Sequence, residues 1–334
     1  MAIRSLSRSR LMRLGLTLTL MCAVQVLLSA RRKEKRERVG LPTDVDSPVE
    51  SVCRPDLRVN VLPPMANNSR TVLRDLFTYI TTPHEKTCRK ITRFGGQTTW
   101  FWDRTAGSDG HKYVCMDPEF DILGTNQCLV YSFGISTDWS FDWDMERFGC
   151  SVFAFDPFVR EKAGNQNGTI VLYKYAIGSA SNADNEVNVK KLGASTRTLD
   201  FIVERLGHAH SQIHYMKMDV EYSEYGVLKQ QTERMHRSAL FKNVQQLGVE
   251  LHFKEYMPLL DHMDYFQSLY QIFLKMQEMG FYLFLYDPNR LLPPDLEVPG
   301  LSQKLYSAIE VVWLKTRCVG QTRESIWHAP PQTA

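Results

Sequence analysis

The sequence predicts an α/β fold in which helices cover both faces of a mostly parallel, seven-stranded sheet. From Cys128 onward, short runs rich in β-branched and aromatic residues alternate with segments of helical periodicity. Because parallel strands need a crossover between them, this alternation is typical of strand-helix-strand units. The expected strands are residues 128–133, 151–155, 169–176, 213–220, 246–253, 281–286 and 309–314. A Pro-rich loop without a helical pattern separates the last two, so we expect that the final strand can enter antiparallel.

Helices are expected where apolar residues recur on one face and the ends carry capping residues. Ser69 is the expected N-cap of a first helix, whose apolar side chains share a face up to Ile80 before Thr82-Pro83 ends it. Three later helices are expected to end at glycines, which adopt the left-handed conformation of a C-cap without strain. They are 141–148 before Gly149, 201–206 before Gly207, and 265–279 before Gly280. Residues 85–112 are predicted to be loop-like.

The bulk composition is that of an ordinary globular protein, with 43% hydrophobic and 23% charged residues among 334. Much of the formal net charge of +3 lies near the N-terminus, where basic residues flank an apolar stretch. The rest of the chain is close to neutral. We therefore expect no nucleic-acid binding, because such binding requires basic residues gathered on the folded domain.

The apolar stretch, residues 14–30, carries no charge and lies at the short end of the roughly 17 to 25 residues that span a bilayer as a helix. Leu28-Ser29-Ala30 matches only part of a signal-peptide cleavage pattern, so we expect an uncleaved anchor that holds the protein in a membrane. The expected organisation is a basic N-terminal tail (1–13), a transmembrane signal-anchor (14–30), a stalk or linker (31–68), a folded domain (69–318) and a C-terminal tail (319–334).

Two features favour a domain in the lumen of the ER or Golgi, within the secretory pathway. Asn67-Asn68-Ser69 and Asn167-Gly168-Thr169 are glycosylation acceptor sequences and predict a glycoprotein. Outside the apolar stretch, cysteines at positions 53, 88, 115, 128, 150 and 318 are even in number, which is compatible with disulfides. They form no CxxC pair, so no metal site is predicted.

Two other features leave the location open. Lys and Arg are slightly more numerous after the apolar stretch than before it, which favours a cytosolic C-terminus. Residues before Glu34 contain no acid and are rich in Arg and Ser, which is compatible with mitochondrial targeting as a minor alternative.

A candidate ligand site lies at the carboxyl ends of the first two expected strands. In such sheets, a glycine there admits a ligand and an acid after the second strand can hold ribose hydroxyls. Gly134 follows the first expected strand, and Asp156 ends the second, 22 positions later. As a strand-end acid facing a ligand, Asp156 is expected to contribute little to the core. The alternative is that the glycine and the Asp-Pro strand exit are only structural.

Acidic residues also gather where the fourth expected strand ends. Asp219, Glu221 and Glu224 follow one another closely there, and such clustering suits acid-base chemistry unless the acids only cap the next helix. In the fifth expected strand, Glu250 and His252 lie on one face near the strand's exit. Either is a candidate general base, and a satisfied buried pair is the alternative.

Several of these segments carry a resemblance to a known family. They are Cys128-Leu129-Val130-Tyr131-Ser132-Phe133-Gly134, Gly149-Cys150 with Phe155-Asp156-Pro157, Lys191-Leu192-Gly193, and Met218-Asp219-Val220-Glu221. They closely resemble the methyltransferase-like protein 24 family and, more distantly, the FkbM-type O-methyltransferases, over about residues 70–318. The resemblance implies a Rossmann-like class I methyltransferase fold, S-adenosyl-L-methionine as methyl donor and often a hydrophobic N-terminal segment.

The resemblance also implies roles for individual residues. Ser132, Gly134 and Ser136 would border the methionine portion, Asp156 would take the ribose, Ala176 and Ile177 would lie near adenine, and Asp219 and Glu221 would lie at the methyl-transfer end. Two departures stand out. Ser132 occupies a position where the wider family has an acid, and a second glycine is missing near Ser136 and Asp138.

The expected function is therefore methyl transfer to an oxygen or nitrogen of an unknown acceptor. Candidate catalytic residues are Asp219, Glu221, Glu250 and His252. Trp100 and Trp102 either line the acceptor pocket or are buried anchors.

Two other functions compete with this one. The departures allow a catalytically inactive interaction protein built on a methyltransferase fold. A Golgi-type glycosyltransferase would bind Mn²⁺ through Asp142-Trp143-Asp144. These acids fall inside a helical pattern, so we expect them to occupy the solvated first turn of a helix instead of a metal site.

Overall fold

The computed structural model describes residues 57, 59–83, 87–122, 128–179, 195–316 and 325–326. All of them belong to Val52–Ala334, one of two compact units of the chain. The basic tail, the apolar stretch and the charged start of the stalk lie outside the described residues, as do Cys53, Cys318 and Lys191-Leu192-Gly193. Within the described part, none of the helices combines the length and apolar character needed to cross a bilayer.

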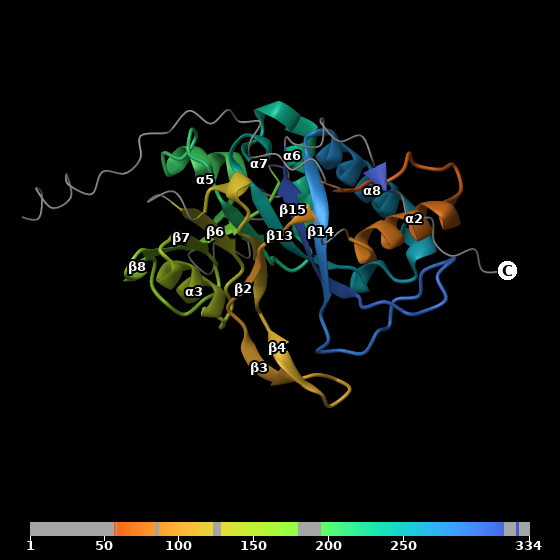
Figure 1. Cartoon of the computed structure of the whole chain (residues 1–334), viewed down its shortest axis with the longest axis horizontal. Helices are drawn as coiled ribbons and strands as arrows, with labels where there is room; N and C mark the ends of the chain where they lie inside the picture. The colour runs from red at the N-terminus through yellow and green to blue at the C-terminus, as the bar shows by residue number, and fades with distance from the viewer. Residues whose placement is uncertain are drawn as a thin grey trace, which may run out of the picture. The chain divides into compact units, whose positions relative to one another are not determined.

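An eight-stranded sheet forms the centre of the described unit, in the order β14-β15-β13-β12-β6-β7-β9-β8 (Figure 1). Its strands are β6 (Leu129–Phe133), β7 (Ser151–Phe155), β8 (Gly164–Asn167), β9 (Ile170–Tyr173), β12 (Tyr215–Met218), β13 (Gln246–His252), β14 (Phe281–Pro288) and β15 (Ala308–Lys315). The strands β13, β12, β6, β7 and β9 are parallel to one another. The predicted α/β class is confirmed, and every predicted strand has a counterpart.

The sheet differs from the prediction at its edges. β15 runs antiparallel to both β13 and β14, as the missing crossover helix indicated. The eighth strand, β8, was not predicted. It pairs antiparallel with β9 across a tight turn at Gly168, and its sequence Gly-Asn-Gln-Asn has none of the apolar alternation that indicates a strand.

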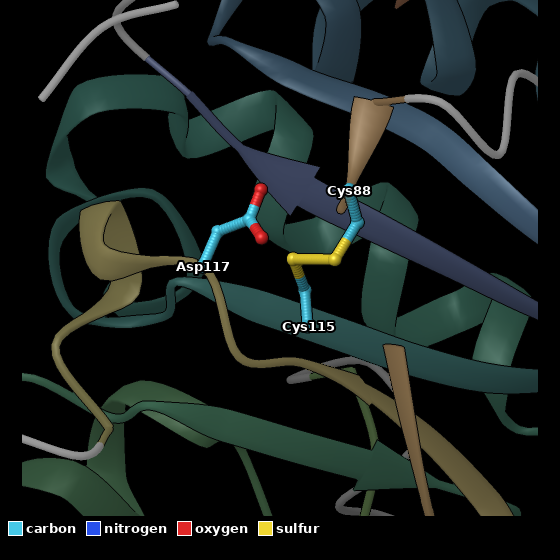
Figure 2. Close-up of side chains that lie close together, drawn as sticks. All are labelled: Cys88, Cys115 and Asp117. Carbon is cyan, nitrogen blue, oxygen red and sulfur yellow. A yellow bond between two sulfur atoms is a disulfide. The ribbon is translucent and has the colours of Figure 1, made fainter. Parts of the chain in front are cut away.

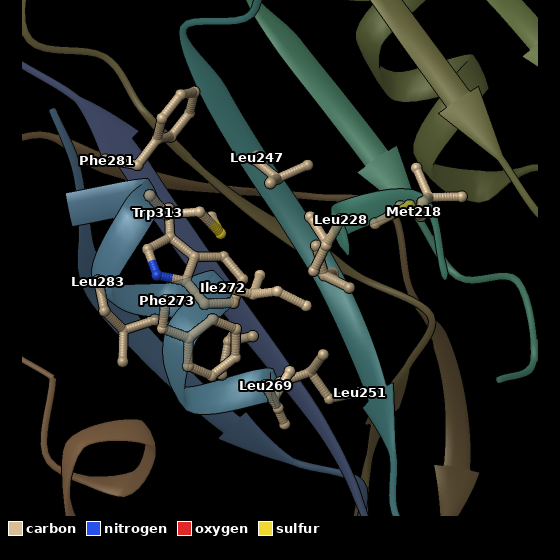
Figure 3. Packing of buried hydrophobic residues seen from close by; sticks show 14 of the residues in the cluster. Met218, Leu228, Leu247, Leu251, Leu269, Ile272, Phe273, Phe281, Leu283 and Trp313 are labelled. Atoms are coloured by element: carbon tan, nitrogen blue, oxygen red, sulfur yellow. The ribbon is translucent and has the colours of Figure 1, made fainter. Parts of the chain in front are cut away.

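Helices pack on both faces of the sheet. One face carries α2 (Ser69–Thr81), α5 (Leu199–Arg205), α6 (Glu224–Arg234), α7 (Ala239–Asn243) and α8 (Met263–Glu278), whose apolar residues belong to the larger buried cluster. Figure 3 shows Leu269, Ile272 and Phe273 of α8 lying against Trp313 of β15 and the leucines of β13. The other face carries α3 (Ser140–Phe148), and there alternate strand residues such as Val312 join a second cluster.

The helix ends largely follow the capping prediction. Gly149 has φ +114° and caps α3, while Gly207 and Gly280 also have positive φ values of +75° and +89° just after α5 and α8. The N-cap of α2 is Asn68 and not Ser69, because the Asn68 side chain accepts a 3.1 Å hydrogen bond from the backbone of Thr71.

The segment predicted to be loop-like instead holds four short strands, so that prediction was wrong. They are β2 (Ile91–Phe94), β3 (Gln97–Trp100), β4 (Ala106–Asp109) and β5 (Lys112–Cys115). β2 pairs with β5, and β3 pairs with β4, so the chain forms one antiparallel hairpin that reaches away from the large sheet (Figure 1). Trp100 and Trp102, on this hairpin, are 72% and 46% exposed, so neither is a buried anchor.

Two disulfides lie within the described residues, Cys88–Cys115 and Cys128–Cys150. The first joins the segment before β2 to the end of β5 and closes the base of the hairpin (Figure 2). Asp117, beside it in Figure 2, accepts hydrogen bonds from the backbone N–H groups of Arg89 and Lys90. The two disulfides agree with the expectation that the even number of cysteines is compatible with such bonds.

The folded unit begins before Ser69, where the stalk was expected to end. Leu57, Val59 and Leu62 are buried, and β1 (Val59–Asn60) pairs with β16 (Ser325–Ile326) in the expected C-terminal tail. The Asn60 amide donates hydrogen bonds of 3.1 Å to the Tyr79 carbonyl and 3.0 Å to the Thr82 carbonyl. The end of the expected stalk is therefore part of the folded unit. Its apolar side chains are buried, and Asn60 satisfies carbonyls at the end of α2.

Asn60→Ala is predicted to destabilise the protein. It leaves carbonyls at the end of α2 without their side-chain donor, at a cost of about 1 to 3 kcal/mol, or a fall in Tm of roughly 2 to 4 °C per kcal/mol. Thermal denaturation followed by circular dichroism measures the effect, with Arg70→Ala, at an exposed position of α2, as control. Equal Tm values for Asn60→Ala and the parent would show that β1 is peripheral.

Candidate functional site

A cavity of about 710 Å³ opens at the carboxyl ends of the central parallel strands, where ligands of open α/β sheets bind. We call it the larger cavity. It is bordered by the segments that follow β6, β7 and β12 and by the short strands β10 (Tyr175–Ile177) and β11 (Ser195–Arg197). Of the six residues expected to bind a cofactor, five line it: Gly134, Ser136, Asp156, Ala176 and Ile177.

Gly134 shapes the loop after β6 because no other residue fits there. Its φ is +78°, and an added Cβ would lie 1.6 Å from the backbone oxygen of Asp219. Lys217 donates a hydrogen bond to the Gly134 carbonyl, and the Gly134 N–H donates to Phe155 at 3.0 Å. The loop is therefore pressed against the exits of both neighbouring strands, β7 and β12.

Asp156 is held by the backbone on both of its carboxylate oxygens. Oδ2 accepts hydrogen bonds from the N–H groups of Ile135 at 2.9 Å and Ser136 at 2.8 Å. Oδ1 accepts from Phe158 at 2.7 Å and Val159 at 3.0 Å. The expectation that Asp156 contributes little to the fold was wrong, because this buried acid joins the loop after β6 to the exit of β7. Its contact with a ribose stays a prediction.

Ser132 does not line the larger cavity. Its side chain is fully buried, in the layer between the sheet and α3, where it interacts with Asp142. Burial raises the pKa of Asp142 to about 6, against the opposing effects of Lys217 and Ser132. Successive strand residues alternate between the two faces of a sheet, so Ser132 of β6 packs toward α3 and does not line this cavity.

Asp142 and Asp144 lie in different surroundings. Asp142 is buried, so the expectation that it sits in a solvated turn was wrong. Asp144 accepts a 2.7 Å hydrogen bond from the Gly95 N–H and pairs with Arg147. Neither acid lines the larger cavity, and their separate partners give no support to a shared metal site.

The inner end of the larger cavity meets a group of buried charges. Asp219, at the exit of β12, lies 3.9 Å from the Lys217 ammonium. Burial acts to raise the pKa of Asp219, but Lys217 and Lys112 outweigh it and hold the pKa below its usual value. Lys112 of β5 donates a 2.8 Å hydrogen bond to Glu310 of β15. The hairpin thus supplies a cation to this site, which the sequence did not predict.

Glu250 has the opposite shift. Burial and the nearby charge of Asp219 raise the pKa of Glu250 to about 7, although Lys112 and a 2.8 Å hydrogen bond from Asn289 act to lower it. Two neighbouring carboxylates with pKa values displaced in opposite directions are typical of a site that moves protons near neutral pH.

His252 is part of a buried pair. Its Nδ1 lies 3.0 Å from Glu224, whose same oxygen accepts a hydrogen bond from the His252 backbone. Burial acts to lower the pKa of His252, but Glu224, Glu250 and Glu221 outweigh it and raise the pKa to about 9. This shift favours the protonated ring at neutral pH, and a protonated ring does not accept a further proton. Glu221, 3.6 Å from Nε2, is mostly exposed and lines the larger cavity.

Ligand atoms of Asp219, Glu250 and His252 lie within 4.8 Å of one another. This spacing would suit one divalent cation, but His252 would first have to lose its proton and its bond to Glu224. Lys112 and Lys217 already supply positive charge beside Asp219, and Lys112 supplies it beside Glu250, so a metal ion would meet two nearby ammonium groups.

A second cavity of about 260 Å³ lies beside the first and shares Asp109, Gly110 and Asp219 with it. We call it the smaller cavity. Its other lining residues come from the hairpin and from the ends of β13, β14 and β15, and they include His111, Lys112, Glu250, Asp287, Asn289 and Glu310. Sequence reasoning missed most of them. The only available signal was the polar Asp-Pro-Asn segment that ends β14.

Comparison with known proteins points to one family. A family model described as a methyltransferase domain matches residues 69–290, more than half of the chain. The "Probable methyltransferase-like protein 24" of Rattus norvegicus is 31% identical over 143 residues, which cover 42% of this chain and 38% of the relative. The protein of the same name from Homo sapiens is 29% identical over 154 residues, which cover 44% and 40%. The chain thus matches less than half the length of either relative.

Two solved structures are also similar. A putative hemolysin from Streptococcus thermophilus has a TM-score of 0.32 and 14% identity, with 64% of this chain and 71% of that chain covered. An O-methyltransferase from neocarzinostatin biosynthesis, in complex with S-adenosylmethionine, has a TM-score of 0.21 and 10% identity, with 56% and 49% covered. At these TM-scores, neither structure supports a conclusion about this chain.

The family match contains β6, β7, β12 and β13, the strands whose carboxyl ends border the two cavities. It also confirms the resemblance to the methyltransferase-like protein 24 family that these same segments carry. The chain belongs to the methyltransferase domain family.

Proposed function

We propose that this protein is an S-adenosyl-L-methionine-dependent methyltransferase that binds the methyl donor in the larger cavity. The observation that carries the proposal is the position of this cavity. It lies at the carboxyl ends of β6, β7 and β12, and its lining includes Asp219, which neighbours Glu250 of the adjoining smaller cavity.

The lining of the larger cavity fits the parts of such a donor. Ile177 and the exposed ring of Phe158 offer apolar surface for a purine. The Ser136 loop offers polar groups for the amino-acid portion. Asp219 offers a negative charge for a sulfonium, since Lys217 and Lys112 keep its carboxylate ionised. When bound, S-adenosyl-L-methionine supplies a methyl group activated by its positive sulfur.

The chain's own residues contribute chiefly by positioning. The Gly134 loop and Asp156 fix one wall of the cavity, and the His252–Glu224 pair fixes the exit of β13 beside Glu250. Glu250 is the general base for an acceptor hydroxyl or amine, because its carboxylate exchanges a proton near neutral pH. Glu221 lies at the cavity surface and His252 acts on Glu250 through its charge.

One observation favours the alternative of an inactive methyltransferase-fold interaction protein. All four hydrogen bonds that Asp156 accepts come from the backbone, so a ribose would have to share an acid that is already satisfied. Binding of the donor separates the two functions, because an inactive scaffold with a lost site would not bind it.

Asp156→Ala is predicted to weaken donor binding and to lower stability together. Hydrogen bonds to a charged acceptor contribute about 1.5 to 3 kcal/mol, so the Kd for S-adenosyl-L-methionine should rise roughly 10- to 100-fold. Calorimetric titration of the parent, of Asp156→Ala and of Asp261→Ala, an exposed acid, measures the change. Unchanged affinity in a folded Asp156→Ala variant would mean that the nucleoside site lies elsewhere. Absence of binding by the parent would favour the inactive alternative.

Glu250→Gln is predicted to slow methyl transfer about 10²- to 10⁴-fold, the usual effect of removing a general base. Glu250 accepts a proton only when ionised. With its pKa raised to about 7, the parent's kcat/KM should rise with pH through that value and then level off. Glu297→Gln, which changes an exposed acid paired with Lys304, is the control and should keep this profile. A Glu250→Gln enzyme with an unchanged rate and pH profile would exclude Glu250 as the base.

We also propose that residues 14–30 anchor the protein in a membrane, with the domain in the lumen of the secretory pathway. Two disulfides suit an oxidising compartment, and Asn67, the first acceptor for glycosylation, is exposed. Glycosidase treatment of the protein made in animal cells should then increase its electrophoretic mobility, and Asn67→Gln should remove part of that shift. Import into mitochondria would contradict this placement. So would a protein that carries no glycan and is digested when protease is added to sealed microsomes.

A further inference from the structure

We propose that the methyl acceptor is a neutral, polyhydroxylated molecule of the sugar class, bound in the smaller cavity and methylated on a hydroxyl group beside Glu250. This inference rests on the proposed methyl transfer and adds the chemical class of the substrate.

Position makes the smaller cavity the acceptor site. It shares Asp219 with the larger cavity, so a group bound there lies next to the methyl-transfer end of the donor. Glu250 lines the smaller cavity and does not line the larger one. A molecule in the smaller cavity therefore meets the base on one side and the donor on the other, which is the arrangement that transfer between two bound reactants requires.

The charge of the walls disfavours an anionic acceptor. Three basic side chains, Arg93, Lys112 and Arg290, face five acidic ones, Asp109, Asp219, Glu250, Asp287 and Glu310. Two of the basic groups are also engaged, because Lys112 pairs with Glu310, and Arg290 pairs with Asp103 outside the cavity. A phosphate or carboxylate would meet an excess of negative charge, whereas a neutral molecule would not.

The walls offer both acceptors and donors of hydrogen bonds at close quarters. His111 bonds Asp287 through Nε2 at 2.9 Å, while its Nδ1 is buried and has no hydrogen-bond partner among the described residues. The same holds for Oε1 of Glu310, whose other oxygen binds Lys112. Unpaired buried polar atoms are costly. Hydroxyl groups, which donate and accept at once, satisfy such a mixed set.

Aromatic rings complete the match to a sugar. Phe101 and Tyr113 line the smaller cavity, and the Arg290 guanidinium lies 4.7 Å from the Phe101 ring centre. Such rings pack against the apolar C–H faces of a sugar while polar groups bind its edges. About 260 Å³ is below the usual range for drug-sized ligands and suits a single sugar ring.

Exposed tryptophan beside this cavity offers a place for a second sugar unit. The Trp102 backbone N–H donates to Arg290 at 3.2 Å, and its indole N–H donates to Tyr306 at 3.3 Å. The indole is thus held in a fixed position next to a lining residue although it is 46% exposed. The β3–β4 hairpin contributes little to the core. Holding this exposed ring beside the cavity is a role that the hairpin can have instead.

The reaction step balances without a further reactant. The acceptor hydroxyl oxygen forms a bond to the methyl carbon as the carbon–sulfur bond breaks and its electron pair passes to sulfur. The hydroxyl proton passes to the Glu250 carboxylate. The products are a methyl ether and S-adenosylhomocysteine.

The test measures transfer of labelled methyl from S-adenosyl-L-methionine to a panel of small acceptors by the full-length protein. The panel holds neutral methyl glycosides and disaccharides, glucuronate, glucose 6-phosphate and phenol. We expect transfer to at least one neutral glycoside, with an ether product identified by mass spectrometry. Transfer only to the anionic compounds or to phenol, or to none of the panel by protein that binds the donor, would overturn the sugar proposal. Failure of the protein to bind the donor in calorimetry would instead overturn the proposed function.

Variants locate the acceptor. Asp287→Ala and His111→Ala should raise KM for the glycoside roughly 10-fold or more, as the loss of about 1.5 to 3 kcal/mol implies, with donor affinity unchanged. Trp102→Ala should raise KM for the disaccharide and leave that for the monosaccharide near the parent's value. Glu297→Gln should change none of these values. Unchanged glycoside KM values in folded Asp287→Ala and His111→Ala would overturn the smaller cavity as the acceptor site.

Discussion

The carboxylate of Asp156 is the constraint on which the rest of the site depends. A buried charge is costly unless it is fully hydrogen-bonded, and here four backbone N–H groups from two loops supply the bonds. The loop after β6 is thereby tied to the exit of β7. That position presses Gly134 against Asp219, where no side chain fits. One acid thus holds together the two loops that form one wall of the larger cavity.

Lys217 connects this loop to the charged end of the site. It donates a hydrogen bond to the Gly134 carbonyl and lies 3.9 Å from Asp219. Its charge, together with that of Lys112, keeps Asp219 ionised in spite of burial. The ionised Asp219 then contributes to the raised pKa of Glu250. The shape of the larger cavity and the raised pKa of Glu250 therefore depend on the same lysine.

The central sheet could be predicted from the sequence because its parallel strands are buried on both faces and read as apolar runs. The strands from Ser151 to Phe155 and from Gln246 to His252 follow directly from such runs. The site's glycine and acid were found for a similar reason, since Gly134 and Asp156 are fixed by their places at strand ends. The fold class and the strand ends that border the larger cavity were therefore within reach.

The hairpin from Ile91 to Cys115 was not predicted, because β2, β3 and β4 are largely polar, lie mostly outside the core and lack an alternating pattern. The role of Asp156 was also out of reach. A strand-end acid can bind a ribose or the backbone equally well, and only the positions of the Ile135 and Phe158 N–H groups decide. Ser132, which the resemblance assigned to the methionine portion, faces α3 and does not line the larger cavity.

The hairpin shows why such omissions matter for function. It supplies Lys112, whose ammonium lies within the acidic group formed by Asp219, Glu250 and Glu310. Without that cation, the three acids would repel one another in a buried space, and at least one would have to take up a proton. Cys88–Cys115 fixes the base of the hairpin at the last residue of β5, three residues beyond Lys112. The hairpin, which the sequence pattern did not predict and which a disulfide closes, therefore supplies a cation to the acidic group where the two cavities meet.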